Sequence, residues 1–306
     1  MSIKKGMILF MEYVKLNNGV EMPILGFGVY QIPKEETKRC VLDAIKVGYR
    51  SIDTAQSYFN ESEVGEAIAE CGIPRSRLFI TTKVWIDNYG YEKCKESVME
   101  SLKKLKTDYI DLVLLHQPFS DYYGAYRALE DLYEEGKIKA IGVSNFYPDR
   151  LSDMCLFERK VIPAVNQVET NPINAQVKAQ ENMEKYGVHI EAWAPFGEGR
   201  NGLFENETLV NIGKKYNKSS AQVILRWLIQ RGVIIACKST HVERMEQNFN
   251  VFDFALTEED MEEIKKLDTE DSLFFNHQDP SMVEWFDNMV KERRNNEDCR
   301  KDKKKW

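Results

Sequence analysis

The stretch YRSIDTAQSYFNESEVGEAIAECGIPRSRLFITTK, residues 49–83, shows the unit from which the fold is built. A short apolar run, YRSIDTA, comes first. A segment with helical spacing, ESEVGEAIAECG, follows it and ends at Gly72, a residue typical of helix C-termini. A second apolar run, LFITTK, comes a few residues later. Short apolar strands that alternate with helices predict a parallel sheet covered by helices.

This unit recurs along the chain. Eight short apolar runs are present: ILGFGVY (24–30), YRSIDTA (49–55), LFITTK (78–83), IDLVLLH (110–116), AIGVSN (140–145), AVNQVE (164–169), HIEAWAP (189–195) and VIIACK (233–238). Segments with helical spacing fill most of the gaps, at 35–48, 61–72, 91–105, 125–138, 175–187 and 220–232. Eight units without a break in composition favour a closed (β/α)8 barrel of the α/β class. An open doubly wound sheet is the structural alternative.

Additional elements are expected at both ends of the barrel. The segment YVKLNNGVEMP (13–23) alternates apolar and polar residues around Asn18-Gly19 and predicts a β-hairpin. TEEDMEEIKKLD (257–268) predicts an extra helix, and the chain from about residue 271 is expected to be an irregular C-terminal loop. We therefore expect one domain over about 12–290, with a short N-terminal extension (1–11) and a polar flexible tail (291–306).

The composition narrows the possible classes of function. With 43% hydrophobic and 11% aromatic residues in 306, the chain can bury a sizeable core, which excludes global disorder. A net charge of −7 argues against a nucleic-acid-binding protein, and no apolar run is long enough to span a membrane. The six cysteines are scattered without a C-x-x-C pair, so we expect reduced thiols in a cytoplasmic protein and no metal site.

Polar and aromatic residues interrupt the apolar runs at their C-terminal ends. They are Asp53, Lys83, His116, Ser144, Asn145, Gln167, Trp193 and Lys238. Each has an ordinary explanation by itself: Asp53 as a helix cap, His116 as a buried histidine, Trp193 as a core residue. In a parallel barrel, however, the C-terminal strand ends converge on the face that carries active sites, so together these residues predict a site.

The motif GEGRNG (197–202) matches the spacing G-x-G-x-x-G, which can bind a dinucleotide. That fingerprint requires the glycines to lie between the first strand and the first helix of a βαβ unit. Here they follow the seventh apolar run. We therefore interpret this segment as a flexible loop.

Several motifs together resemble the aldo-keto reductase family. They are GYRSIDTAQSY (48–58), TTKVW (81–85), LLHQP (114–118), IGVSNF (141–146), VNQVE (165–169) and CKSTHVERMEQN (237–248), and the similarity extends over about residues 12–270. The bacterial diketogluconate and methylglyoxal reductase branch is most similar, because Trp193 stands where many relatives have tyrosine. The resemblance implies a monomeric enzyme that reduces small aldehydes such as methylglyoxal, or keto sugars, with NADPH.

The resemblance implies a catalytic tetrad of Asp53, Tyr58, Lys83 and His116. Carbonyl reduction requires a hydride at carbon and a proton at oxygen, and Tyr58 can be the general acid. A neighbouring lysine ammonium is expected to lower the pKa of the phenol, and Asp53 is expected to hold Lys83 in place. His116 is expected to orient the carbonyl oxygen.

The same resemblance implies the cofactor and substrate contacts. For the nicotinamide these are Trp193 as a stacking surface and Ser144, Asn145 and Gln167 as carboxamide ligands. For the 2′-phosphate and adenine they are Lys238, Ser239, Arg244, Gln247 and Asn248. NADP is the expected cofactor; His241 and Gln247 depart from the residues common in the family, which leaves the strictness of its preference over NAD open. For the substrate they are Tyr30, Gln56, Trp85, His116 and Gln117, with Phe274, Phe275, Trp285 and Phe286 closing the pocket.

Two other functions remain compatible with these residues. Lys83 or Lys238 could form a Schiff base in an aldolase, although Asp53 would keep Lys83 charged and so disfavour the free amine. The chain could also be a non-catalytic, cofactor-binding regulatory subunit, since the fold does not dictate function.

Overall fold

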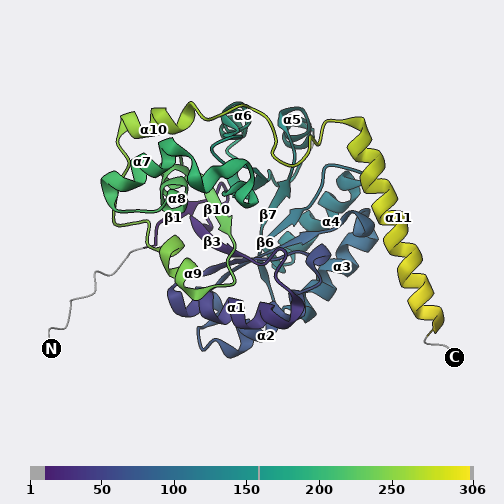
Figure 1. Ribbon diagram of the computed structural model, residues 1–306. Coiled ribbons are helices and arrows are strands. Elements are labelled where there is room, and N and C mark those ends of the chain that lie inside the picture. The colour runs from purple at the N-terminus through teal and green to yellow at the C-terminus, as the bar shows by residue number, and fades with distance from the viewer. Residues whose placement is uncertain (1–10, 158, 304–306) are drawn as a thin grey trace.

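Eight parallel strands close into a barrel in the computed structural model (Figure 1), which describes residues 11–157 and 159–303, with side chains as far as Arg293. The strands are β3 (Leu25–Gly28), β4 (Ser51–Asp53), β5 (Phe79–Val84), β6 (Ile110–Leu115), β7 (Ile138–Ser144), β8 (Val165–Glu169), β9 (His189–Trp193) and β10 (Ile234–Cys237). They follow one another around the barrel in chain order, and β10 pairs with β3 to close it. The predicted barrel is confirmed, and the open sheet is excluded.

Helices surround the barrel (Figure 1). They are α1 (Lys34–Val47), α2 (Glu61–Glu70), α3 (Tyr91–Lys104), α4 (Tyr122–Glu134), α5 (Pro148–Leu156), α6 (Val177–Lys185), α7 (Glu207–Tyr216), α8 (Ser220–Gln230), α9 (Val242–Phe249) and α10 (Glu258–Lys265). Short 3-10 segments lie at η1 (Gln56–Tyr58), η2 (Arg75–Arg77), η3 (Ile86–Asn88) and η4 (Gly197–Glu205). The periodicity predicted most of the helices but not α5, α7 and α9, which have only eight to ten residues.

The predicted hairpin covers one end of the barrel. Strands β1 (Tyr13–Lys15) and β2 (Glu21–Pro23) pair antiparallel, and Gly19 in their connection has a φ of 87°. Leu16 and Met22 of this hairpin are buried in a cluster with side chains such as Leu112 and Ile234 from the barrel strands. The hairpin therefore seals one end of the barrel with apolar side chains, and the opposite end holds the polar residues.

The C-terminal region differs from the prediction. Residues 280–303 were expected to be an irregular loop and a flexible tail, but they form the long helix α11 (Pro280–Lys303). Proline is favoured at the first position of a helix, and the buried Phe286 and Val290 recur at a spacing of four residues. A polar composition concealed this narrow apolar stripe. The expected N-terminal extension lies almost wholly outside the described residues.

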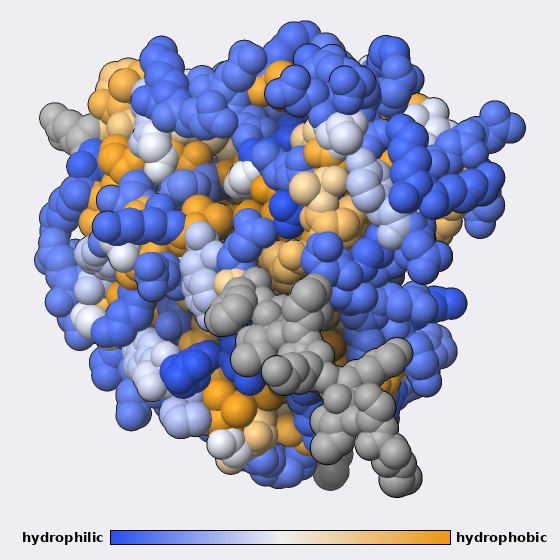
Figure 2. Space-filling model, turned by 90° about the vertical axis from the view of Figure 1, so that its left-hand side faces the viewer, coloured by the Kyte–Doolittle hydropathy of each residue, from blue (hydrophilic) through white to orange (hydrophobic). Residues whose placement is uncertain are grey.

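One face of the molecule is mainly polar. The side of the molecule that carries α7, α9 and α10 faces the viewer in Figure 2, where hydrophilic residues predominate and hydrophobic ones are interspersed among them. Within residues 11–157 and 159–303, no helix is long and apolar enough to cross a bilayer.

Candidate active site

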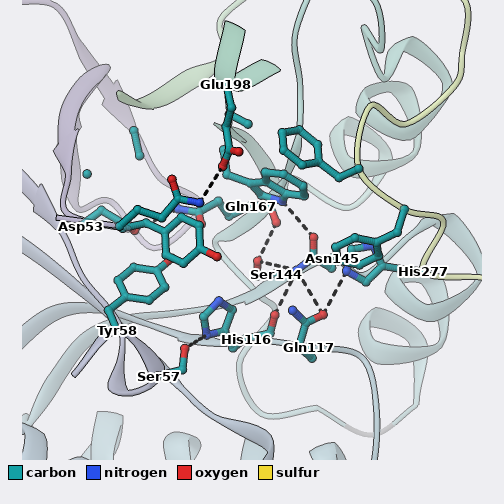
Figure 3. Close-up of a pocket in the computed structure, with 18 of the residues that line it drawn as sticks. Asp53, Ser57, Tyr58, His116, Gln117, Ser144, Asn145, Gln167, Glu198 and His277 are labelled. Atoms are coloured by element: carbon teal, nitrogen blue, oxygen red, sulfur yellow. Dashed lines mark hydrogen bonds between the residues drawn. The ribbon is translucent and has the colours of Figure 1, made fainter. Parts of the chain in front are cut away.

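A cavity of about 680 Å³ lies at the C-terminal ends of the strands. Its lining includes most of the residues predicted at the strand ends: Asp53, Tyr58, His116, Ser144, Asn145, Gln167, Trp193 and Lys238. Figure 3 shows six of these side chains converging on the cavity from β4, β7, β8 and the loops that follow the strands: Asp53, Tyr58, His116, Ser144, Asn145 and Gln167. Closing the barrel thus brings together residues that lie far apart in the sequence.

Asp53, Lys83 and Tyr58 form a connected buried group. The Lys83 ammonium donates to both carboxylate oxygens of Asp53, at 2.6 and 2.7 Å, and to the carbonyl oxygen of Thr54 at 3.1 Å. Its Nζ also lies 3.3 Å from the phenolic oxygen of Tyr58. The Lys83 side chain is fully buried, so its charge interacts with Asp53 and Tyr58 with little screening by water.

The pKa values of this group follow from burial and from the charges beside it. Burial raises the pKa of Tyr58 to about 12, and Lys83 opposes this rise. The lysine therefore acts in the expected direction, but desolvation outweighs it. Burial lowers the pKa of Lys83, yet Asp53 and Tyr58 outweigh that effect and raise it above its ordinary value. The group thus holds a protonated phenol beside a charged ammonium.

His116 completes the predicted tetrad. Its ring meets the Tyr58 ring edge-on with centroids 5.7 Å apart, and its Nδ1 lies 3.4 Å from Ser57 Oγ. Burial, with Lys83 next in importance, holds the pKa of His116 well below its ordinary value. The imidazole is therefore neutral near pH 7 and can donate one N–H bond.

The predicted carboxamide ligands already bond to one another. Trp193 Nε1 donates to Asn145 Oδ1 at 2.9 Å, and Asn145 Nδ2 donates to the carbonyl oxygen of His116 at 3.1 Å. Ser144 Oγ donates to the carbonyl oxygen of Gln167 at 2.8 Å. Gln167 Nε2 donates to Asp53 at 3.0 Å, so this side chain also holds the carboxylate of the tetrad. Figure 3 shows the hydrogen bonds that connect Ser144, Asn145 and Gln167.

A second cavity, of about 900 Å³, adjoins the first. Its lining includes the other predicted cofactor residues, Lys238, Ser239, Arg244, Gln247 and Asn248, and it shares Phe196 and Lys238 with the first cavity. Lys238 and Arg244 are exposed, and no ion pair joins either to the described residues. Two free cations near the N-terminus of α9 suit a phosphate group.

The sequence model of the aldo/keto reductase family matches residues 24–269. This match covers the whole barrel, from β3 to α10. The chain belongs to the aldo/keto reductase family.

Similar proteins agree with this assignment. This aldo/keto reductase is 46% identical over 262 residues to glyoxal reductase of Bacillus subtilis (strain 168), and the alignment covers 85% of this chain and 94% of the relative. It is 39% identical over 258 residues to methylglyoxal reductase DkgA of Escherichia coli (strain K12), and the alignment covers 83% of this chain and 93% of the relative. A solved structure, the Bombyx mori aldo-keto reductase in complex with NADP, has a TM-score of 0.83 at 34% identity. The match covers 87% of this chain and 95% of that structure.

These findings confirm the predicted family, its bacterial reductase branch and an NADP-dependent oxidoreductase. The residues of this aldo/keto reductase fit that cofactor. The two cavities share Phe196 and Lys238, so they can accept a long dinucleotide. Trp193 offers an aromatic face at one end, and Lys238 and Arg244 offer charge at the other.

Most of the predicted substrate residues line the first cavity. They are Tyr30, Trp85, His116, Gln117, Phe274, Phe275, Trp285 and Phe286. Gln56 is the exception. Its amide bonds to the Trp85 backbone N–H, Asn88, Ser97 and Ser101, so it braces the loop after β5 and does not line the cavity. That prediction was wrong, because all of the hydrogen-bonding capacity of the side chain is used within the protein.

Three further residues of the site were missed. Glu191 is buried in β9, where an acid in the apolar run HIEAW was a readable signal. His277 Nε2 lies 3.0 Å from Gln117 Oε1, and burial lowers the pKa of His277 to about 4. Arg293 lines the cavity from α11. No local pattern marked His277 or Arg293, because each reaches the site through long-range packing.

Proposed function

We propose that this aldo/keto reductase reduces the carbonyl group of small aldehydes or keto sugars to an alcohol, with Tyr58 as the proton donor. The observation that carries the proposal is the buried group in which Lys83 Nζ lies 3.3 Å from the Tyr58 oxygen and 2.6 Å from Asp53. Bound NADPH supplies the hydride that reduces the carbonyl carbon.

Each residue of the group has a distinct task. A phenol with a pKa of about 12 is fully protonated at neutral pH, which is the form that an acid needs for carbonyl reduction. As the proton leaves the phenol, the ammonium of Lys83 stabilises the developing phenolate. Asp53 keeps Lys83 charged and in position, and Gln167 holds the second oxygen of that carboxylate.

His116 positions the substrate in this proposal. Its neutral imidazole can donate an N–H to the carbonyl oxygen from the side opposite Ser57. A charged imidazolium would compete with Tyr58 as the acid, and the low pKa of His116 prevents this near neutrality. The carbonyl oxygen then has two donors, one that orients it and one that protonates it.

The cofactor contacts are proposed on the same basis. Trp193 is fixed by its bond to Asn145, so its ring can present a rigid face to the nicotinamide. Asn145 and Ser144 can exchange some of their internal bonds for bonds to the carboxamide. Lys238, Ser239, Arg244, Gln247 and Asn248 would hold the adenosine end, with the 2′-phosphate between the two cations.

The carbonyl substrate is inferred from the relatives and from the pocket. Two relatives are named for the reduction of glyoxal and methylglyoxal. The pocket walls combine aromatic side chains with the Gln117 amide, which suits a small carbonyl compound with polar substituents. We propose that the chain works as a monomer, because the residues of the proposed site all come from one chain.

A Schiff-base aldolase is less well supported. Such an enzyme needs a free amine, whereas the raised pKa of Lys83 keeps that side chain protonated. Lys238, the other candidate lysine, is exposed and lines both cavities.

Substitution of Tyr58 by Phe tests the proposed function. Tyr58→Phe removes only the hydroxyl, so NADPH binding should remain within about twofold while turnover of methylglyoxal falls by roughly a hundred- to ten-thousand-fold. The decrease in NADPH absorbance measures turnover, and a fluorescence titration measures NADPH binding. Turnover within tenfold of the wild type would remove Tyr58 from its proposed role.

A further inference from the structure

Helix α11 supplies a part of the cavity that lies outside the family match. The match ends at residue 269, and α11 begins at Pro280. Figure 1 shows this helix beside the barrel, outside α3 and α4. Phe286, Met289 and Arg293 line the cavity, and their spacing of three and four residues places them on one face of the helix. The contacts of this face are therefore a feature of this chain in addition to the shared barrel.

Phe286 anchors that face of α11 against the barrel. Its side chain is only 4% exposed, and its ring packs against Phe119 at a centroid distance of 5.2 Å and against Trp85 at 6.2 Å. The helix is thus held by aromatic contacts at the mouth of the cavity. A residue two turns further along the same face has a defined position relative to the site.

Arg293 is that residue, and no ion pair joins it to another residue among 11–157 and 159–293. The guanidinium carbon lies 5.0 Å from the centroid of the Trp85 ring and 5.5 Å from that of Phe59. Its Nη1 is buried without a hydrogen-bond partner among residues 11–157 and 159–293. Cation–π contacts stabilise the face of a guanidinium but leave its N–H donors unused. A buried donor of this kind is costly unless a ligand accepts its bond.

The carboxylates of the cavity do not neutralise Arg293. Among the described lining residues these are Asp53 and Glu198. Asp53 is bound to Lys83, and Glu198 lies 3.3 Å from the Gln31 amide and 3.8 Å from Arg200. Figure 3 shows Glu198 on the far side of the cavity from His116. Near α11 the cavity therefore has a positive charge that no carboxylate of the described lining residues neutralises.

The positive charge lies close to the reacting end of the cavity. Trp85 touches both Arg293 and His116, whose ring centroid is 5.2 Å from that of Trp85. The charge of Arg293 also helps to lower the pKa of His116, after burial and Lys83. A ligand held by His116 at one end can thus reach Arg293 with a short carbon chain along Trp85.

We propose that Arg293 binds the carboxylate of the substrate, so that the preferred substrates are oxo carboxylic acids in which a few carbon atoms separate the carbonyl from the carboxylate. This inference rests on the proposed function, since it assumes that the carbonyl is bound by Tyr58 and His116. The planar fork of a guanidinium matches a carboxylate in a bidentate manner. A single cation among aromatic walls suits a monoanion better than a phosphate dianion, whose second charge would be left unpaired.

The test compares succinic, glutaric and adipic semialdehydes with their methyl esters. Each pair has the same chain and the same reacting aldehyde, and differs in the charge of the far end. The variants are Arg293→Met, which removes the charge, and Arg293→Lys, which keeps it without the fork. Lys291→Met is the matched control, because Lys291 is an exposed cation on the same helix that pairs with Asp287.

We expect the wild type to prefer at least one semialdehyde over its ester. Arg293→Met should lower kcat/KM for that semialdehyde by roughly ten- to a hundredfold, mainly through KM, and change the ester by less than about twofold. Arg293→Lys should recover part of the lost kcat/KM for the semialdehyde, and Lys291→Met should leave kcat/KM unchanged for both substrates. NADPH binding within twofold of the wild type would show that the variants are folded.

Two outcomes separate the inference from the proposed function. In the first outcome, the wild type reduces the esters but prefers no semialdehyde, or Arg293→Met lowers kcat/KM equally for acid and ester. Arg293 then only anchors α11, and the inference is overturned while the proposed reductase function stands. If the wild type reduces none of these aldehydes or methylglyoxal with NADPH, the proposed function itself is overturned.

Discussion

Replacing Lys83 by methionine tests the central group of the site. Lys83 is fully buried, and its ammonium bonds to both oxygens of Asp53, to the Thr54 carbonyl and to the Tyr58 phenol. Methionine fills a similar volume without the charge. The variant therefore leaves the Asp53 carboxylate buried with the Gln167 amide as its remaining side-chain donor.

Two effects of the substitution can be separated. Removing one partner of a buried ion pair costs about 3–5 kcal/mol of unfolding free energy, because the other charge is left uncompensated. Loss of the ammonium beside the phenol should also lower kcat by roughly a hundred- to ten-thousand-fold, the usual size of a general-acid contribution. The double variant Asp53→Asn/Lys83→Met removes the orphaned charge, so it should recover most of the stability but none of the activity.

Urea unfolding measures the first effect, and single-turnover NADPH oxidation measures the second. A loss of stability below about 1 kcal/mol in Lys83→Met would contradict the buried pair. Turnover within tenfold of the wild type would contradict the role of Lys83 in proton transfer. Equal instability in the single and double variants would show that packing, not charge, causes the loss.

Two further predictions concern the cofactor and the dependence of stability on pH. Lys238→Ala should raise the NADPH dissociation constant at least tenfold, because only NADPH carries the 2′-phosphate, and change the NADH dissociation constant by less than about twofold. A tryptophan-fluorescence titration measures both constants. Equal weakening of the two cofactors would mean that Lys238 binds a group common to both. Burial, with the charge of Asp53 next, raises the pKa of Glu191 from 4.5 to about 8, so the folded protein holds a proton that the unfolded chain releases above pH 4.5. Wild-type stability should therefore fall as pH rises from about 4.5 to 8, whereas Glu191→Gln, which cannot ionise, should lose this part of the dependence. Parallel urea stability curves for the two proteins across that range would refute the assignment.

Local sequence was sufficient to predict the barrel and the gathering of polar residues at one of its faces. Strand and helix periodicities are properties of a few neighbouring residues, and a parallel barrel brings all C-terminal strand ends to one face. The hairpin around Asn18-Gly19 was predictable for the same reason, since its turn is formed by adjacent residues. The proposed roles of Asp53, Tyr58, Lys83 and His116 came from the resemblance of their motifs to the aldo-keto reductase family, before any distance between them was known.

Tertiary structure decided how the side chains are used and how strongly their charges act. Gln56 bonds to α3 and to the loop after β5, although its position in the motif suggested a substrate contact. The pKa of Tyr58 rises because burial outweighs the nearby ammonium, and the depth of burial is set only when the barrel closes. Arg293 reaches the cavity because α11 folds back over Trp85, a contact between segments about two hundred residues apart that no local periodicity encodes.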